Sequence, residues 1–231
     1  MGPVRGSRRA LASPPVHLLL TDRLSCPRCG PTFGLILRAD RLESRRLLDG
    51  VLGCPNCRDS FPVSDGFADL RAPPRGDLGP GLAGPPAGRH GEGEGGPDAG
   101  VARLVALLGI VGGPGTVALA GEAARLAEHV AAALPELLVV AVDPDMRLWP
   151  ETPGVSRLAS GPGLPFFGST LRGVVVDGRL GPDWLSEAAR VVHAKARVVV
   201  LHAPHDAAGA LGACGLTVLA REAETVVAAR G

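Results

Sequence analysis

Four of the five cysteines in this 231-residue chain fall into two Cys-x-x-Cys pairs, Cys26/Cys29 and Cys54/Cys57, with 24 residues between the pairs. A Cys-x-x-Cys turn brings two thiolates onto one ion. Two such turns complete a closed, tetrahedral four-thiolate site, which is the form that structural zinc takes. The spacing therefore predicts a structural zinc ion held by Cys26, Cys29, Cys54 and Cys57. The alternatives are thiols that hold no metal, or a redox pair, although a redox motif normally occurs once, at a strand-to-helix turn.

The sequence around these cysteines is too short to bury a large core, and domains of that size often need a metal. We therefore expect a small zinc-binding domain over residues 20–71, with a hairpin between the two cysteine pairs. Residues 1–19 are expected to be a disordered N-terminus. Residues 72–100 hold ten Gly and six Pro among 29 positions, a composition that predicts a flexible linker. A second domain is expected over residues 101–231.

The charge and hydropathy of the chain argue against several classes of protein. The formal net charge is +1, from 24 basic and 23 acidic residues, which disfavours a strongly basic nucleic-acid-binding protein. An Arg-rich stretch over 38–46 leaves RNA as a weak candidate partner, against the alternative of a solvated hairpin turn. The apolar run 16–20 is too short for a secretory signal, so a cytoplasmic protein is expected. The uncharged stretch 104–121 is rich in glycine, which argues against a membrane span.

The second half of the chain alternates apolar strands with helical patterns. Strands are expected at 116–120, 137–143, 155–158, 173–177, 196–201, 216–219 and 225–228, with helices at 101–110, 122–134, 184–193 and 206–213. Continuous apolar strands between helices indicate a mostly parallel sheet covered on both faces. The last two strands are joined by a charged turn, which suggests a terminal hairpin. The expected fold class is α/β and Rossmann-like, preceded by a small four-cysteine, zinc-ribbon-like domain.

The first half resembles the Trm-type methyltransferase-activator family of small zinc proteins. The resemblance is carried by the two cysteine motifs, Leu24 to Cys29 and Leu52 to Cys57, and by the tail Phe61-Pro-Val-Ser-Asp-Gly-Phe-Ala-Asp-Leu-Arg71. Phe61 stands for the family's usual Tyr, and Phe67-Ala68 for its usual Ile-Pro. The resemblance implies a methyltransferase as partner, bound by the addition of an edge strand. Similar segments also occur fused ahead of methyltransferase domains.

The second half is similar to the class I methyltransferases that use S-adenosylmethionine, and it ends in the same kind of hairpin. The resemblance places Gly121 in the glycine loop after the first strand. It makes Asp143, 22 residues further on, the acid that holds the cofactor's ribose hydroxyls. The stretch from Leu164 to Asp177 resembles the family's segment before and within the fourth strand. It names no catalytic residue here.

The departures from that family pattern lie at the cofactor site. Gly121 is followed by Glu122-Ala-Ala-Arg125, so the second and third glycines are missing, and glycines are what allow backbone to approach the ligand. Glu122 would also repel the ligand's carboxylate. The acid expected to hold adenine is absent from 159–163. We therefore expect a zinc protein whose methyltransferase-like domain is non-catalytic and acts as a binding or regulatory partner of a methyltransferase. The alternative is an active methyltransferase that binds S-adenosylmethionine.

Overall fold

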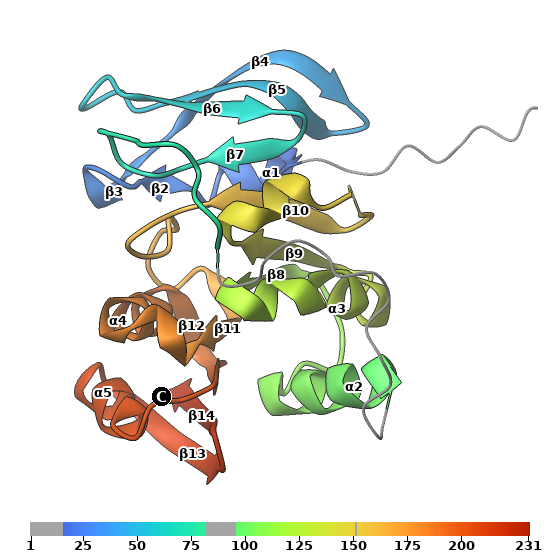
Figure 1. Cartoon of the computed structure of the whole chain (residues 1–231), viewed down its shortest axis with the longest axis vertical. Coiled ribbons are helices and arrows are strands. Elements are labelled where there is room, and N and C mark those ends of the chain that lie inside the picture. The colour runs from blue at the N-terminus through green and yellow to red at the C-terminus, as the bar shows by residue number, and fades with distance from the viewer. Residues whose placement is uncertain (1–15, 82–95, 151) are drawn as a thin grey trace, which may run out of the picture.

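One continuous sheet organises the molecule, as the computed structural model of the chain shows (Figure 1). The structure describes residues 16–81, 96–150 and 152–231. Twelve strands of this described part join the sheet, and two more short strands pair beside it. The sheet combines a C-terminal α/β part (residues 96–231) with an N-terminal module (residues 16–71) that carries the cysteine motifs.

The C-terminal part contributes seven strands. Their spatial order is β10 (Val155–Ala159), β9 (Leu137–Val142), β8 (Gly115–Ala120), β11 (Leu171–Asp177), β12 (Val192–Leu201), β14 (Thr225–Arg230) and β13 (Leu216–Glu222). The first five run parallel, and β14 is antiparallel to both of its neighbours. This confirms the expected Rossmann-like, mostly parallel sheet with a terminal hairpin. The order reverses between β8 and β11, and ligands of such sheets bind at the carboxyl ends of the strands beside this reversal.

Helices cover both faces, which explains why the parallel strands consist largely of apolar residues. On one face lie α2 (Gly96–Leu108) and α3 (Ala127–Ala133), and on the other α4 (Pro182–Val191) and α5 (Ala207–Ala213). In β8, Val117 and Leu119 pack toward the first pair, whereas Ala118 and Ala120 pack into the opposite core. Short 3-10 turns, η1 (Gly121–Leu126), η2 (Pro144–Leu148) and η3 (Gly178–Leu180), follow β8, β9 and β11.

The N-terminal module is antiparallel. Its elements are β1 (Val16–His17), α1 (Leu18–Thr21), β2 (Ser25–Cys26), β3 (Gly30–Gly34), β4 (Ile36–Glu43), β5 (Arg46–Gly53), β6 (Ser60–Ser64) and β7 (Phe67–Asp69). The expected hairpin between the cysteine pairs is formed by β4 and β5. β4 lies at the edge of the sheet, and its charged side chains and register shifts are devices that protect an edge from further pairing.

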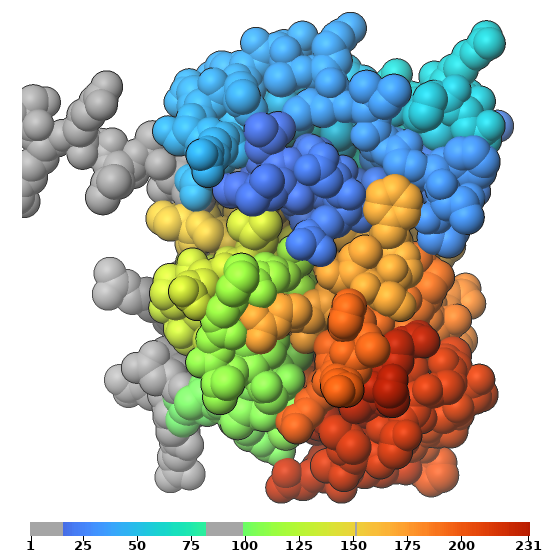
Figure 2. All heavy atoms as spheres, turned by 180° about the vertical axis from the view of Figure 1, so that it is seen from behind, coloured from blue at the N-terminus to red at the C-terminus, as the bar shows by residue number. Residues whose placement is uncertain are grey.

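β7 links the module to the C-terminal part. It pairs antiparallel with β6 and parallel with β10, with Ala68 opposite Leu158. Beyond the strand, the Leu70 amide donates to the Ala159 carbonyl at 2.8 Å. Near the first cysteine pair, Ser25 N donates to Pro165 O at 3.0 Å. Figure 2 shows the module (blue) packed directly on the C-terminal part.

The two halves also share one apolar core. A single buried cluster contains Leu20, Leu52 and Phe61 of the module together with Leu158 and Phe166 of the C-terminal part. The N-terminal module and the C-terminal α/β part are therefore joined by backbone pairing and by buried side chains.

Parts of segment 72–100, expected to be a flexible linker, make specific contacts. α2 begins at Gly96. Arg71 donates to the carbonyls of Gly76 and Asp77, at 3.0 and 3.3 Å. The expectation of flexibility comes from the Gly and Pro content of the segment. That content takes no account of these hydrogen bonds between a side chain and the backbone. Residues 1–15 and 82–95, which include most of the expected disordered N-terminus and half of the expected linker, lie outside the described residues.

Candidate functional site

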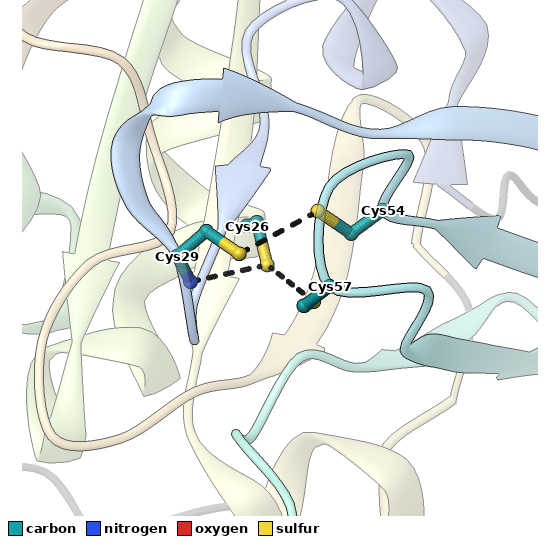
Figure 3. A group of neighbouring side chains, drawn as sticks. All are labelled: Cys26, Cys29, Cys54 and Cys57. Carbon is teal, nitrogen blue, oxygen red and sulfur yellow. Dashed lines mark hydrogen bonds between the residues drawn. The ribbon is translucent and has the colours of Figure 1, made fainter.

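The four cysteines of the two motifs meet at one point of the N-terminal module (Figure 3). Cys26 ends β2 and Cys29 lies in the turn before β3, while Cys54 and Cys57 form the turn between β5 and β6. All four sulfur atoms lie within 4.8 Å of one another. The Cys26–Cys57 and Cys29–Cys54 sulfur separations are 3.7 and 3.8 Å.

These separations are those of a metal site. A disulfide has its sulfurs about 2.05 Å apart, whereas a tetrahedron with zinc–sulfur bonds of about 2.3 Å has edges of roughly 3.8 Å. Two backbone or amide donors already point at sulfur: Cys29 N to Cys26 Sγ at 3.4 Å, and Asn56 Nδ2 to Cys29 Sγ at 3.3 Å. The four side chains therefore fit a tetrahedral zinc ion, and Cys214, the fifth cysteine, stands outside this cluster.

The surroundings of Cys54 favour ionisation of its thiol. Burial by itself raises the pKa of Cys54, but the backbone amides of Cys57 and Asn56 and the neighbouring thiols outweigh burial and bring the pKa to about 7. At Cys57 burial and the neighbouring thiols act together, and they raise the pKa to about 12 although the backbone amide of Asp59 lowers it. A thiolate at Cys54 is the charge state that a metal ligand requires.

Gly121 and Asp143, the two residues proposed for the cofactor, lie at the ends of neighbouring strands. Gly121 directly follows β8 and has a positive φ of 69°, and a Cβ there would lie 2.9 Å from the Cβ of Asp177. Asp143 directly follows β9, is 3% exposed, and accepts a hydrogen bond of 2.8 Å from Asp145 N. Because β8 and β9 pair side by side, the structure brings the two residues to one edge of the sheet.

An ion cluster fills the carboxyl ends of β8 and β11, where the strand order reverses. The Arg179 guanidinium forms an ion pair with Glu122 and donates to the buried carboxylate of Asp177, with Nη2 at 2.6 Å and Nε at 3.0 Å. Burial alone would raise the pKa of Asp177, but the hydrogen bonds from Arg179 outweigh it and hold that pKa below its usual value. His202 Nδ1 lies 3.5 Å from Asp177.

This cluster shows which basic residue pairs with Glu122 and what charge lies between the carboxylates of Glu122 and Asp177. Arg125 is the nearest basic residue in sequence to Glu122, yet the ion pair with Glu122 comes from Arg179. Glu122, Asp177 and His202 lie close enough together to share a cation, but the guanidinium of Arg179 already supplies the positive charge between the carboxylates. Sequence spacing does not reveal Arg179, because its partners come from two different strand ends.

The chain itself covers Asp143, the acid expected to hold a ribose. Gly81 lies in direct contact with the Asp143 carboxylate, and Gly81 N donates to Asp145 Oδ1 at 2.9 Å. Arg147 Nη2 donates to the carbonyl of Leu78 at 2.8 Å. A ribose needs the Asp143 carboxylate open to its hydroxyl groups, so the residues in this arrangement do not fit S-adenosylmethionine.

Two of the four arginines in residues 38–46, the candidate RNA contacts, pair with acids. Arg41 Nε lies 2.7 Å from Asp49, and Arg38 Nη2 lies 3.6 Å from Asp40. Paired arginines at an edge strand are typical of a solvated surface. None of the helices in the described part of the chain is both long and apolar enough to cross a membrane.

Three kinds of comparison with known proteins were made: with family models, with curated proteins and with solved structures. The sequence matches no protein-family model and no curated protein. Among solved structures, the antibiotic-resistance methyltransferase Kmr is similar, with 15% identity, 57% of this chain and 93% of that chain covered, and a TM-score of 0.41.

A methyltransferase in complex with the Haloferax volcanii Trm112 activator is also similar, with 16% identity, coverage of 57% of this chain and 80% of that chain, and a TM-score of 0.40. Geranyl diphosphate methyltransferase, solved with sinefungin, has 15% identity, coverage of 53% and 60%, and a TM-score of 0.41. The TM-scores of these three likenesses lie below 0.5, so the Rossmann-like α/β class of the C-terminal part rests on its own strand order.

Proposed function

We propose that this chain is a cytoplasmic binding or regulatory protein in which a zinc-stabilised, activator-type module completes the sheet of a methyltransferase-like domain that transfers no methyl group. In this proposal Cys26, Cys29, Cys54 and Cys57 hold one structural zinc ion. The zinc fixes the two turns of the module, and no step of a reaction passes through it.

The pairing of β7 supports the role of the module. In the resemblance, an activator adds an edge strand to a separate methyltransferase. Here β7 already has β6 on one side and β10 on the other, so both of its edges are used within the chain. The partner of the module is therefore the C-terminal part of the same molecule, and β7 has no free edge with which to bind another methyltransferase. Any further protein partner must bind elsewhere.

The observation that carries the non-catalytic proposal is the contact of Gly81 with the carboxylate of Asp143. A second contact, the ion pair of Arg179 with Glu122, lies just after Gly121, where the family's glycine loop would approach the ligand. A cofactor would have to displace both Gly81 and this ion pair. The alternative, an active methyltransferase, is favoured by the places of Gly121 and Asp143 at the ends of β8 and β9, where that family holds its cofactor.

Calorimetric titration of S-adenosylmethionine into the zinc-loaded, full-length protein tests the proposal, with Asp143→Ala as the control variant. We expect no binding at millimolar ligand in either protein. Micromolar binding to the wild type that is lost in Asp143→Ala would overturn the proposal and establish the alternative, and a search for the methyl acceptor would follow.

A further inference from the structure

We infer that residues 77–81, here called the strap, are an internal occupant of the ribose position and that a nucleoside with free ribose hydroxyls binds only when the strap is displaced. This inference rests on the proposed function, because it concerns why the methyltransferase-like domain is closed. It adds that the closure at Asp143 is reversible and lies outside the motifs that carry the two family resemblances.

The strap is held at its start by Arg71, the last residue of the module, and by Arg75. Arg71 is fixed by Asp69, with Nη2 2.9 Å from Oδ2, and it donates to the backbone carbonyls of Gly76 and Asp77. Arg75 donates to the Ser60 carbonyl at 2.6 Å and lies 4.8 Å over the ring of Phe61. The strap therefore leaves the module in a defined direction, toward the carboxyl ends of β9 and β10.

At its far end the strap rests on the turn that follows β9. Leu78 packs against the core that contains Met146, and its carbonyl accepts from Arg147. Gly81 then lies on Asp143 and donates its amide to Asp145 Oδ1. Between these two contacts, Gly79 and Pro80 are exposed. A segment with so few buried contacts opens at low free energy compared with the strands beneath it.

The chemistry of these contacts is that of a ribose diol. A ribose donates hydrogen bonds from its hydroxyl groups to a carboxylate. The Gly81 amide likewise donates a hydrogen bond to the carboxylate of Asp145, in the turn that follows Asp143. Asp145 is 2% exposed, and its Oδ2 has no hydrogen-bond partner among the described residues. A buried carboxylate oxygen without a donor is unfavourable. The turn therefore has an acceptor that the strap leaves unused and that a second hydroxyl would satisfy.

The two glycines of the strap provide a matched pair of variants. Neither Gly79 nor Gly81 has a positive φ, so both backbones accept a side chain. A Cβ at Gly81 would collide with the Asp143 carboxylate, whereas a Cβ at Gly79 would meet nothing within 4 Å. We expect Gly81→Val to displace the strap and Gly79→Val to leave it in place. Leu78→Ser combined with Arg147→Gln displaces it by a different route, without a new side chain at residue 81.

The experiment measures amide hydrogen exchange at Leu78, Gly79 and Gly81, since Pro80 has no amide hydrogen. It also measures binding of adenosine, and both use the full-length, zinc-loaded protein. Adenosine is the probe because it tests the ribose position without involving the Arg179 cluster. We expect exchange to be at least tenfold faster in Gly81→Val and in the double variant than in the wild type or Gly79→Val. We expect adenosine to bind at least tenfold more tightly to the displaced variants, and Asp143→Ala added to them to remove this gain.

Unchanged adenosine affinity in variants whose strap exchanges faster would overturn the inference, as would wild-type exchange at the rate of an unstructured peptide. The wild-type titration with S-adenosylmethionine separates this inference from the proposed function. If the wild type binds S-adenosylmethionine, the proposed function fails. The inference then stands if binding speeds exchange at Gly81, and it also fails if exchange at Gly81 is unchanged.

Discussion

The guanidinium of Arg157, buried in β10, donates a hydrogen bond of 2.8 Å from Nη2 to the backbone carbonyl of Asp65 in the β6–β7 turn. Its Nη1 donates to the carbonyls of Met146, at 3.3 Å, and of Trp149, in and just after the turn that follows Asp143. One buried cation therefore joins the N-terminal module to the turn that follows Asp143. Asp65 and Met146, two of the residues whose carbonyls it binds, are more than 75 residues apart in the sequence.

We expect Arg157→Met to lower the free energy of unfolding by about 2–4 kcal/mol, because it leaves several carbonyls without their charged donor. Chemical denaturation measures the loss. Arg38→Met is the matched control, since that side chain is 73% exposed and its loss should change stability by no more than about 0.5 kcal/mol. Equal stability of the two variants would contradict a joining role for Arg157.

Zinc content should follow the cysteine cluster. We expect one zinc ion per wild-type chain, and the same in Cys214→Ser, because Cys214 lies outside the cluster. Cys54→Ser should lose the ion and the fold of the module, since structural zinc supplies on the order of 10 kcal/mol in small domains. Elemental analysis of the purified proteins measures the content. A zinc-free wild type whose stability does not rise when zinc is added would refute the assignment.

The two halves should unfold together. They share one sheet and one buried core, so neither half can lose its structure without exposing the other. Both tryptophans, Trp149 and Trp184, lie in the C-terminal part, whereas the expected zinc lies in the module. We expect tryptophan fluorescence and zinc release to give the same midpoint in a denaturant titration. Two separate midpoints would show that the junction at β7 contributes little.

The Arg179–Asp177 pair should make stability depend on pH. The pKa of Asp177 is lowered in the fold, so its carboxylate stabilises the protein above the unfolded pKa of about 3.9. This contribution disappears as the pH falls through the lower, folded pKa. In Arg179→Gln the buried carboxyl loses its cation, and its pKa should rise.

We therefore expect Arg179→Gln to be less stable than the wild type by about 1–3 kcal/mol at pH 7. The difference should shrink as the pH falls through the raised pKa of Asp177 in the variant and then through its lowered pKa in the wild type. Denaturation at a series of pH values measures this. Arg103→Gln is the control, because Arg103 pairs with the exposed Glu222 and should show almost no effect at any pH. A difference that stays constant with pH would mean that Asp177 does not titrate as the partner of Arg179.

Local patterns in the sequence predict much of the C-terminal part. The apolar runs at 116–120 and 137–143 give β8 and β9 to within a residue at either end, and the charged turn near 221–224 gives the terminal hairpin. The helix expected over 122–134 is split into η1 and α3. The Arg179–Glu122 ion pair that lies against η1 was not predictable, because it joins residues that periodicity does not relate.

By itself, the sequence determined the Rossmann-like α/β class and the grouping of two cysteine pairs, because strand periodicity and Cys-x-x-Cys turns are set by neighbours along the chain. Only the tertiary structure decided that β7 completes the sheet through β10, that Arg157 joins the two halves, and that Gly81 lies on Asp143. Each of these contacts joins segments more than 60 residues apart in the sequence. Such contacts depend on how the whole sheet packs, and no local pattern of residues encodes that packing.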